Sequence, residues 1–246
     1  MNKKSTKERT HILNLLIEGN SLRATSRIAG CSINTVTKLL VETGEACARY
    51  QHKFLVNLPC KRIQVDEIWS FGYAKQKTVT KGKDEAGDVW IWTAIDTNTK
   101  IVPSWRIGHR DEETEQEFIY DLASRMANKI QIEPEKHQHH LSSNCNQTRH
   151  LAGSPGIKYI SKNFAKKHCL TMSLGKRGFT QSTNGLSYKI KKYAHAIALH
   201  FMDYNFVRIH KDLKVSPAMA VGVSNTLWNL EKVIQMVDSY WREKSM

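Results

Sequence analysis

Asp66 is the residue of this sequence that most directly suggests chemistry. It lies in Arg62–Ser70, an apolar segment that is typical of a strand. An ionised carboxylate beside Val65 and Ile68 costs several kcal/mol unless it is paired or binds a cation. Phosphodiester cleavage or joining can use two Mg²⁺ ions held by about three carboxylates. We therefore expect Asp66 to bind a metal ion, with an ion pair to a nearby Lys or Arg as the alternative. Glu67 should point to the opposite face of the strand, because side chains alternate.

Further carboxylates for such a site are scarce. The run from Lys136 to Met202 contains no Asp or Glu. Glu133 and Glu135 follow a short apolar segment that predicts a strand, and from there they could reach toward Asp66. Pro134 fixes the backbone between these two acids. They are the candidates that would complete a catalytic site.

The charge balance indicates a polyanionic partner. The chain has 37 Lys and Arg against 23 Asp and Glu, with a formal net charge of +14 and a pI near 9.6. This balance is typical of proteins that neutralise nucleic-acid phosphates. A solvated basic surface, or binding to RNA or the ribosome, would also explain the charge, but neither would explain Asp66.

No membrane segment is expected. The sequence has no apolar run near the roughly 20 residues that a membrane-spanning helix needs, and no signal-peptide pattern follows Met1. We therefore expect a cytoplasmic protein, associated with the nucleoid, that does not contact membranes.

The cysteines and histidines predict neither disulfides nor a zinc site. The five cysteines are odd in number and form no Cys-x-x-Cys pair, which is typical of reduced thiols. The segment His137–His140, with Cys145 and His150 nearby, lies in polar, loop-like sequence and has no zinc-site spacing.

Residues 1–50 predict a helix-turn-helix module. Ser21 and Ser32 are suited to cap two short helices, and Ala29-Gly30-Cys31 supplies the turn between them. The second helix would bury Ile33, Val36 and Leu40 and would present polar side chains to base edges and phosphates, namely Asn34, Thr35, Thr37 and Lys38. An ordinary helical hairpin is the alternative.

Residues 60–132 predict the first half of a ribonuclease H-like α/β domain. After a connecting helix and a break at Asn57–Pro59, three strands form an antiparallel meander, and a helix capped by Asp111 precedes a fourth strand. The expected strands are Arg62–Tyr73, Val89–Ile95, Ile101–Ile107 and Lys129–Ile132. A basic loop, Lys75–Asp84, joins the first two.

The remaining sequence predicts a helical second half of that domain, residues 159–246. A helical run, Leu186–Phe206, precedes Arg208 and His210, which either contact phosphate or cap the helix end. An apolar stripe from Trp228 to Val237 predicts a closing helix that packs within the chain, with self-association as the alternative. Residues 133–158 match neither half and are interpreted as an aberrant loop or deletion junction.

Three segments resemble transposases of bacterial insertion sequences of the insertion-sequence-one type, which carry a DDE catalytic domain. The resemblance spans residues 8–132 and 159–237, and it rests on Arg62–Phe71, Trp90–Asp96, and Tyr204–Lys211 with Ser216–Ala220. It implies a ribonuclease H-like mixed sheet preceded by a small all-α module. It also implies Mg²⁺- or Mn²⁺-dependent DNA strand cleavage and transfer by a homo-oligomer that binds terminal inverted repeats and target DNA. By this resemblance Asp66 is the first catalytic carboxylate.

The sequence departs from that family at the other two acids. The family places its second Asp directly after the fourth strand, in a Ser/Thr-Asp-Gly turn, whereas this chain has Glu133-Pro134-Glu135. Lys166 stands where the third acid is expected, before Leu170-Thr171-Met172. A lysine there would repel a divalent cation. The resemblance therefore implies a transposase impaired in catalysis, and the alternative is a catalytically silent DNA-binding remnant or repressor acting on terminal repeats.

Overall fold

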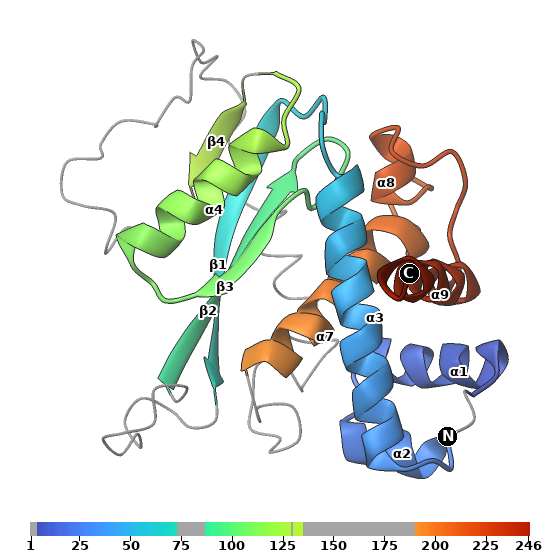
Figure 1. Cartoon of the computed structure of the whole chain (residues 1–246). Helices are drawn as coiled ribbons and strands as arrows, with labels where there is room; N and C mark the ends of the chain where they lie inside the picture. Colours follow the sequence, from blue (N-terminus) through green and yellow to red (C-terminus); the bar gives the residue numbers. More distant parts are fainter. Residues whose placement is uncertain (1–3, 73–86, 129, 135–189) are drawn as a thin grey trace.

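The computed structural model describes residues 4–72, 87–128, 130–134 and 190–246, and these form a mixed α/β structure. Helix α3 stands between a small sheet on one side and helices α1, α8 and α9 on the other (Figure 1). The predicted basic loop at 75–84 lies outside the described residues, as does nearly all of the segment 133–158.

The N-terminal helices begin at serine caps, of which Ser21 and Ser32 were predicted and Ser5 was not. Helix α1 (Thr6–Ile17) starts in a capping box between Ser5 and Glu8. Helix α2 (Leu22–Ile28) is capped by Ser21, whose hydroxyl accepts a hydrogen bond from the backbone N–H of Ala24 at 3.2 Å. Ser32 caps helix α3 (Ile33–Phe54) by accepting from the N–H of Asn34 at 3.1 Å. Gly30 turns the chain between α2 and α3 with φ +57°, a conformation that favours glycine.

Helix α3, the second helix of the predicted helix-turn-helix, is longer than predicted. The sequence predicts a short helix followed by a separate connecting helix, but α3 runs without a break from Ile33 to Phe54. No Gly or Pro signal in this range is strong enough to end it, and its buried face continues from Val36 to Gln51. The predicted module boundary at residue 50 therefore falls inside α3.

The sheet has the strand order β3-β2-β1-β4. Strand β1 (Arg62–Gly72) pairs antiparallel with β2 (Gly87–Asp96), which pairs antiparallel with β3 (Trp105–Gly108). Strand β4 (Gln131–Pro134) lies on the other side of β1 and runs parallel to it. The predicted antiparallel meander and the position of the fourth strand after a helix are both confirmed.

The third strand is shorter than the predicted Ile101–Ile107. It begins at Trp105, because Pro103 has no N–H to donate to a ladder. In addition, the side chain of Asn205 holds both backbone groups of Val102, at 3.0 Å to its N–H and 2.9 Å to its carbonyl. The side chain of Asn205, which is distant in the sequence, thus binds the backbone groups that Val102 would otherwise offer to a neighbouring strand. Strand β4 likewise begins at Gln131 instead of Lys129, which lies outside the described residues.

Helix α4 (Glu112–Ser124) covers one face of the sheet. Asp111 caps it as predicted, with its carboxylate accepting from the N–H of Thr114 at 2.8 Å. Phe118 is fully buried, and its ring centroid lies 6.1 Å from that of Trp92 in β2. The crossover that returns the chain to β4 is therefore held by aromatic packing.

Helix α7 (Ile190–Met202) packs against α3 near the β3 edge of the sheet. Gln51 of α3 donates a hydrogen bond to the carbonyl of Ala198 at 3.0 Å, and Phe201 stacks on Trp105 with ring centroids 5.7 Å apart. The predicted helical run continues as a π-helical segment, η2 (Asp203–Val207), and its start at Leu186 lies outside the described residues. Helix α7 thus joins the sheet to the N-terminal helices.

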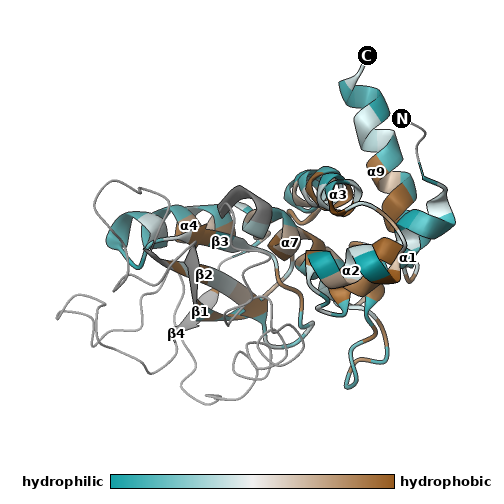
Figure 2. Ribbon diagram, turned by 90° about the horizontal axis from the view of Figure 1, so that it is seen from below, coloured by the Kyte–Doolittle hydropathy of each residue, from teal (hydrophilic) through white to brown (hydrophobic). Residues whose placement is uncertain are grey.

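The chain closes on the N-terminal helices. After the short α8 (Pro217–Ala220), helix α9 (Leu230–Lys244) packs against α1 and α3 (Figure 2). Val233 and Ile234 are fully buried. The predicted packing of this stripe within the chain is confirmed. Among the described residues no helix is long and apolar enough to cross a membrane. The described cysteines, Cys31, Cys47 and Cys60, are free thiols.

Arg125 locks the end of α3 to α4. Its guanidinium donates to the Leu55 carbonyl at 3.3 Å and to both carboxylate oxygens of Asp121, at 2.8 and 2.9 Å. The Ser104 hydroxyl also donates to Asp121, at 2.5 Å. Burial acts to raise the pKa of Asp121, but the hydrogen bonds from Arg125 and Ser104 outweigh it, so the pKa lies below its usual 3.8.

This lowered pKa predicts an acid-dependent contribution to stability. A carboxylate whose folded pKa is depressed contributes stability above its unfolded pKa and loses it as the pH falls through the folded value. Asp121→Asn should therefore lower the free energy of unfolding at neutral pH by about 1 kcal/mol, a modest figure because the side chain is partly exposed. Urea denaturation at successive pH values should show the difference from the native chain shrinking below pH 3.8. A difference that stays constant down to pH 2 would contradict this account.

Candidate functional site

The start of α3 presents the predicted polar side chains. Asn34 and Lys38 are exposed, and Thr35 and Thr37 are partly exposed, as expected. The prediction for Ile33 is wrong, because this side chain is 39% exposed. Ile33 is the first residue of α3, so no preceding turn of the same helix lies against it. The core beneath begins one turn later, at the fully buried Val36.

The segment that carries these residues is basic. No Asp or Glu occurs between Glu18 and Glu42, while exposed Arg23 and Arg27 lie four residues apart on α2. Lys38 lies 3.7 Å from Glu42, but its side chain is 69% exposed, so this ion pair is weak. Sequence reasoning missed both arginines, although their i, i+4 spacing within a capped helix was the available signal. The arrangement is suited to binding phosphates.

Asp66 lies within β1 opposite Thr93 of β2. Its residue is 8% exposed, and its Oδ1 accepts from the backbone N–H of Glu67 at 2.9 Å. Thr93 in turn pairs with Trp105 of β3, so Asp66 and Trp105 share one face of the sheet. That face is opposite to the one covered by α4, whose Phe118 contacts Trp92.

Glu67 lies on the α4 face, as predicted. Its carboxylate forms an ion pair with Arg110 at 2.6 Å, and the guanidinium carbon of Arg110 lies 4.7 Å from the centroid of the Trp90 ring. Register places Glu67 opposite Trp92, on the face away from Asp66. Glu67 thus has a structural partner and does not share a site with Asp66.

Glu133 lies within strand β4, not after it as predicted, because this strand extends to Pro134. Its Cα pairs with Gln64, two residues before Asp66 along β1. Because β1 and β4 are adjacent and parallel, position 133 has the same phase in the pleat as Asp66. Glu135 lies outside the described residues, as does Lys166. Participation of Glu133 and Glu135 in a site with Asp66 stays a prediction.

The described residues do not by themselves fit a two-metal centre. Within this part of the chain no three His, Cys, Asp or Glu side chains are grouped so that they could hold a metal ion. Asp96, at the end of β2, pairs with Ile63 and therefore lies on the face away from Asp66. Its Oδ2 accepts from the Thr99 N–H at 2.7 Å and hydroxyl at 2.8 Å, so it stabilises the β2–β3 turn.

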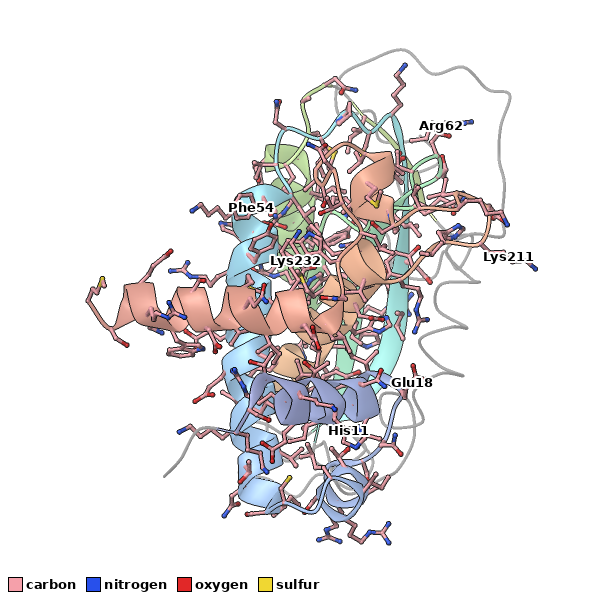
Figure 3. All side chains as sticks on the ribbon, turned by 90° about the vertical axis from the view of Figure 1, so that its right-hand side faces the viewer. His11, Glu18, Phe54, Arg62, Lys211 and Lys232 are labelled. Atoms are coloured by element: carbon pink, nitrogen blue, oxygen red, sulfur yellow. The ribbon has the colours of Figure 1, made fainter. Side chains whose placement is uncertain are left out.

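Arg208 and His210 lie far from the start of α3. Phe206, two residues before Arg208, packs edge-on against Tyr50 near the end of α3, with centroids 5.6 Å apart. At 1.5 Å per residue, Tyr50 is about 24 Å along the helix from Asn34. Figure 3 shows Lys211, in the same loop, on the side of the molecule near Arg62 and away from α2. These two groups of candidate residues therefore belong to separate surfaces.

The local contacts of Arg208 and His210 favour a structural role. Arg208 is paired with the buried carboxylate of Asp203 at 3.6 Å. The N–H of Asp212 donates to Nδ1 of His210 at 3.2 Å. Burial lowers the pKa of His210 below its usual 6.5, so its imidazole is mainly neutral at pH 7. A neutral ring is a weaker phosphate ligand than a cation.

Comparisons with known proteins add no assignment. No protein-family model matches the sequence, and a comparison with curated proteins finds no significantly similar chain.

Proposed function

We propose that this chain is a transposase-type protein that binds duplex DNA through a helix-turn-helix formed by α2 and α3. The basic segment of α2 and the start of α3, with no Asp or Glu between Glu18 and Glu42, carries this proposal. Its helices begin at serine caps, its turn uses Gly30, and its exposed side chains can donate to phosphates and base edges. An ordinary helical hairpin would not require Arg23 and Arg27 to be exposed four residues apart in a segment without Asp or Glu.

The sheet supports descent from a ribonuclease H-like strand-transfer domain. Three antiparallel strands, a covering helix and a fourth strand parallel to the first support this proposal, because the opening half of that fold has this order. Asp66 then holds the position of the first catalytic carboxylate, on the first strand. Strand cleavage and transfer by this chain would depend on Mg²⁺ or Mn²⁺, and the protein would act as a homo-oligomer on terminal inverted repeats and target DNA in the nucleoid.

A second candidate function is a catalytically silent DNA-binding protein that occupies terminal repeats as a repressor. The acid-free run from Lys136 to Met202 favours it. Along the sequence of the helical half, Asp203 is the first carboxylate that could join Asp66. Asp203 is itself buried and paired with Arg208. Catalysis by this copy is therefore proposed to be impaired, while DNA binding is retained.

Asp66→Asn separates the two candidates. The substitution removes the charge of Asp66 but keeps the shape of its side chain. Because Asp66 lies in the sheet and not in the helix-turn-helix, binding to duplex DNA that carries the terminal repeats of the insertion element should be unchanged. Any cleavage or joining in Mg²⁺ or Mn²⁺ should fall at least about a hundredfold, as expected for loss of a metal-binding carboxylate. The matched control is Glu67→Gln, on the opposite face, which should retain whatever activity the native chain has.

The outcomes are distinct. If the native chain cleaves this DNA and Asp66→Asn does not, the transposase activity is established and the proposal of impaired catalysis is wrong. Binding without cleavage by either protein would support the silent candidate. Failure of the native chain to bind duplex DNA in gel-shift titrations would refute both.

A further inference from the structure

Two exposed isoleucines flank the turn between α2 and α3. Ile28, the last residue of α2, is 55% exposed, and Ile33, the first residue of α3, is 39% exposed. Single exposed aliphatic residues are common on protein surfaces. These two, however, lie within the basic segment already described, where Asn34 follows Ile33 directly.

The charge around this apolar pair selects its partner. A symmetric contact with a second copy would bring Arg23, Arg27 and Lys38 of one chain against the same residues of the other. Glu42, 3.7 Å from Lys38, offsets part of that repulsion, but the segment has no Asp or Glu beside Arg23 and Arg27 in the sequence. The phosphates of a DNA duplex complement the same charges. A partner that binds both the cations and the isoleucines therefore needs anionic phosphates and also apolar groups within reach of Ile28 and Ile33.

Thymine supplies such an apolar group in the major groove. Its C5-methyl is the feature that aliphatic side chains contact, and asparagine is suited to bind the N6 and N7 edge of adenine. A recognition helix contacts base edges with its N-terminal residues, and Ile33 and Asn34 are the first two residues of α3. We propose that Ile33 is a specificity-determining residue that contacts a thymine methyl group, so that the start of α3 selects A·T base pairs. This inference rests on the proposed DNA binding.

The test uses duplexes selected from a randomised library by the full-length native chain. Each thymine of a selected duplex is replaced in turn by uracil, which keeps the base pair and removes one methyl group. At one position or more the native chain should bind the uracil duplex about fourfold more weakly, the effect of losing one buried methyl group. Ile33→Ala should bind the thymine duplex with the affinity that the native chain has for the uracil duplex, and should no longer distinguish the two.

Two controls keep the result specific. Ile33→Ala should fold normally, because the side chain is exposed and alanine favours helix, and an unchanged thermal unfolding midpoint checks this. Leu227→Ala removes an equally exposed aliphatic side chain, 44% exposed, from the segment before α9. It should keep the full preference for thymine over uracil.

Each outcome bears on the proposal. Loss of the uracil effect in Ile33→Ala but not in Leu227→Ala supports it. Sequence-specific binding with no uracil effect at any position, or with the same effect in Ile33→Ala, overturns the role of Ile33 and leaves DNA binding intact. A native chain that enriches no duplex refutes the proposed function itself. A concentration-dependent dimer in light scattering that Ile33→Ala abolishes would assign the surface to self-association instead.

Discussion

Gly44→Ala is expected to lower the free energy of unfolding by about 2 to 3 kcal/mol, the upper range for overpacking a core. Gly44 lies where α3 meets α7. A Cβ at this position would lie 2.5 Å from the Cα and 2.6 Å from the carbonyl oxygen of His195. These are backbone atoms, so no side-chain rotation can relieve the contact, and the two helices must move apart. The gain of about 1 kcal/mol from alanine in a helix offsets only part of this cost.

Urea denaturation of the native chain and Gly44→Ala measures the effect as a lower midpoint at constant slope. The matched control is Ala123→Gly at an exposed position in the last turn of α4, which reports helix propensity alone and should cost less than the roughly 1 kcal/mol of a helix interior. A Gly44→Ala chain as stable as the native one would show that α3 and α7 are not in this close contact.

Breaking the ion pair between Arg9 and Asp238 is expected to have the other large effect. The two terminal guanidinium nitrogens of Arg9 donate to the carboxylate of Asp238, at 2.7 and 2.8 Å, and so join α1 to α9. The side chain of Arg9 is only 9% exposed, so Asp238→Leu leaves a buried charge without its main partner. The expected cost is about 3 kcal/mol. Arg9→Met should cost less, about 2 kcal/mol, because Asp238 is more accessible to water.

A double-mutant cycle tests this pair. Arg9→Met with Asp238→Leu should be within about 1 kcal/mol of the native chain, since two apolar side chains replace two charges that had to be desolvated. Lys4→Met provides the comparison, because the Lys4–Glu8 pair is more exposed and should contribute much less to stability. Additive effects of the two single substitutions would mean that the pair is not coupled in solution.

These contacts make α9 part of the N-terminal helical unit. Besides Arg9 and Asp238, the carboxylate of Glu45 on α3 accepts from the Tyr240 hydroxyl at 2.9 Å, and the carbonyl of Glu42 accepts from the Trp241 ring at 3.2 Å. The residues proposed to bind DNA therefore depend on the last helix of the chain for their support. At its other end, α3 is held to α4 by Arg125 and to α7 by Gln51.

The sequence by itself determined the elements whose signals are local. Ser21, Ser32 and Asp111 cap helices because a capping side chain bonds to a backbone N–H only two or three residues away. Strands β1 and β2 and the opposite faces of Asp66 and Glu67 follow from the two-residue period of a strand. The polar exposure of Asn34 and Lys38 follows in the same way from the helical period.

Only the tertiary structure decided features that depend on distant segments. Strand β3 is shortened because Asn205 binds Val102, and the close approach at Gly44 exists because α7 crosses α3 there. Ile33 obeys the periodicity of a buried face but is 39% exposed, since burial requires a neighbouring element and no described helix or strand covers this position. The distance between Arg208 and Asn34 is likewise set by tertiary packing, because Phe206 packs near the end of α3 and Asn34 lies at its start. A local pattern specifies which side chains can be buried, whereas contacts between remote parts of the chain decide which of them are.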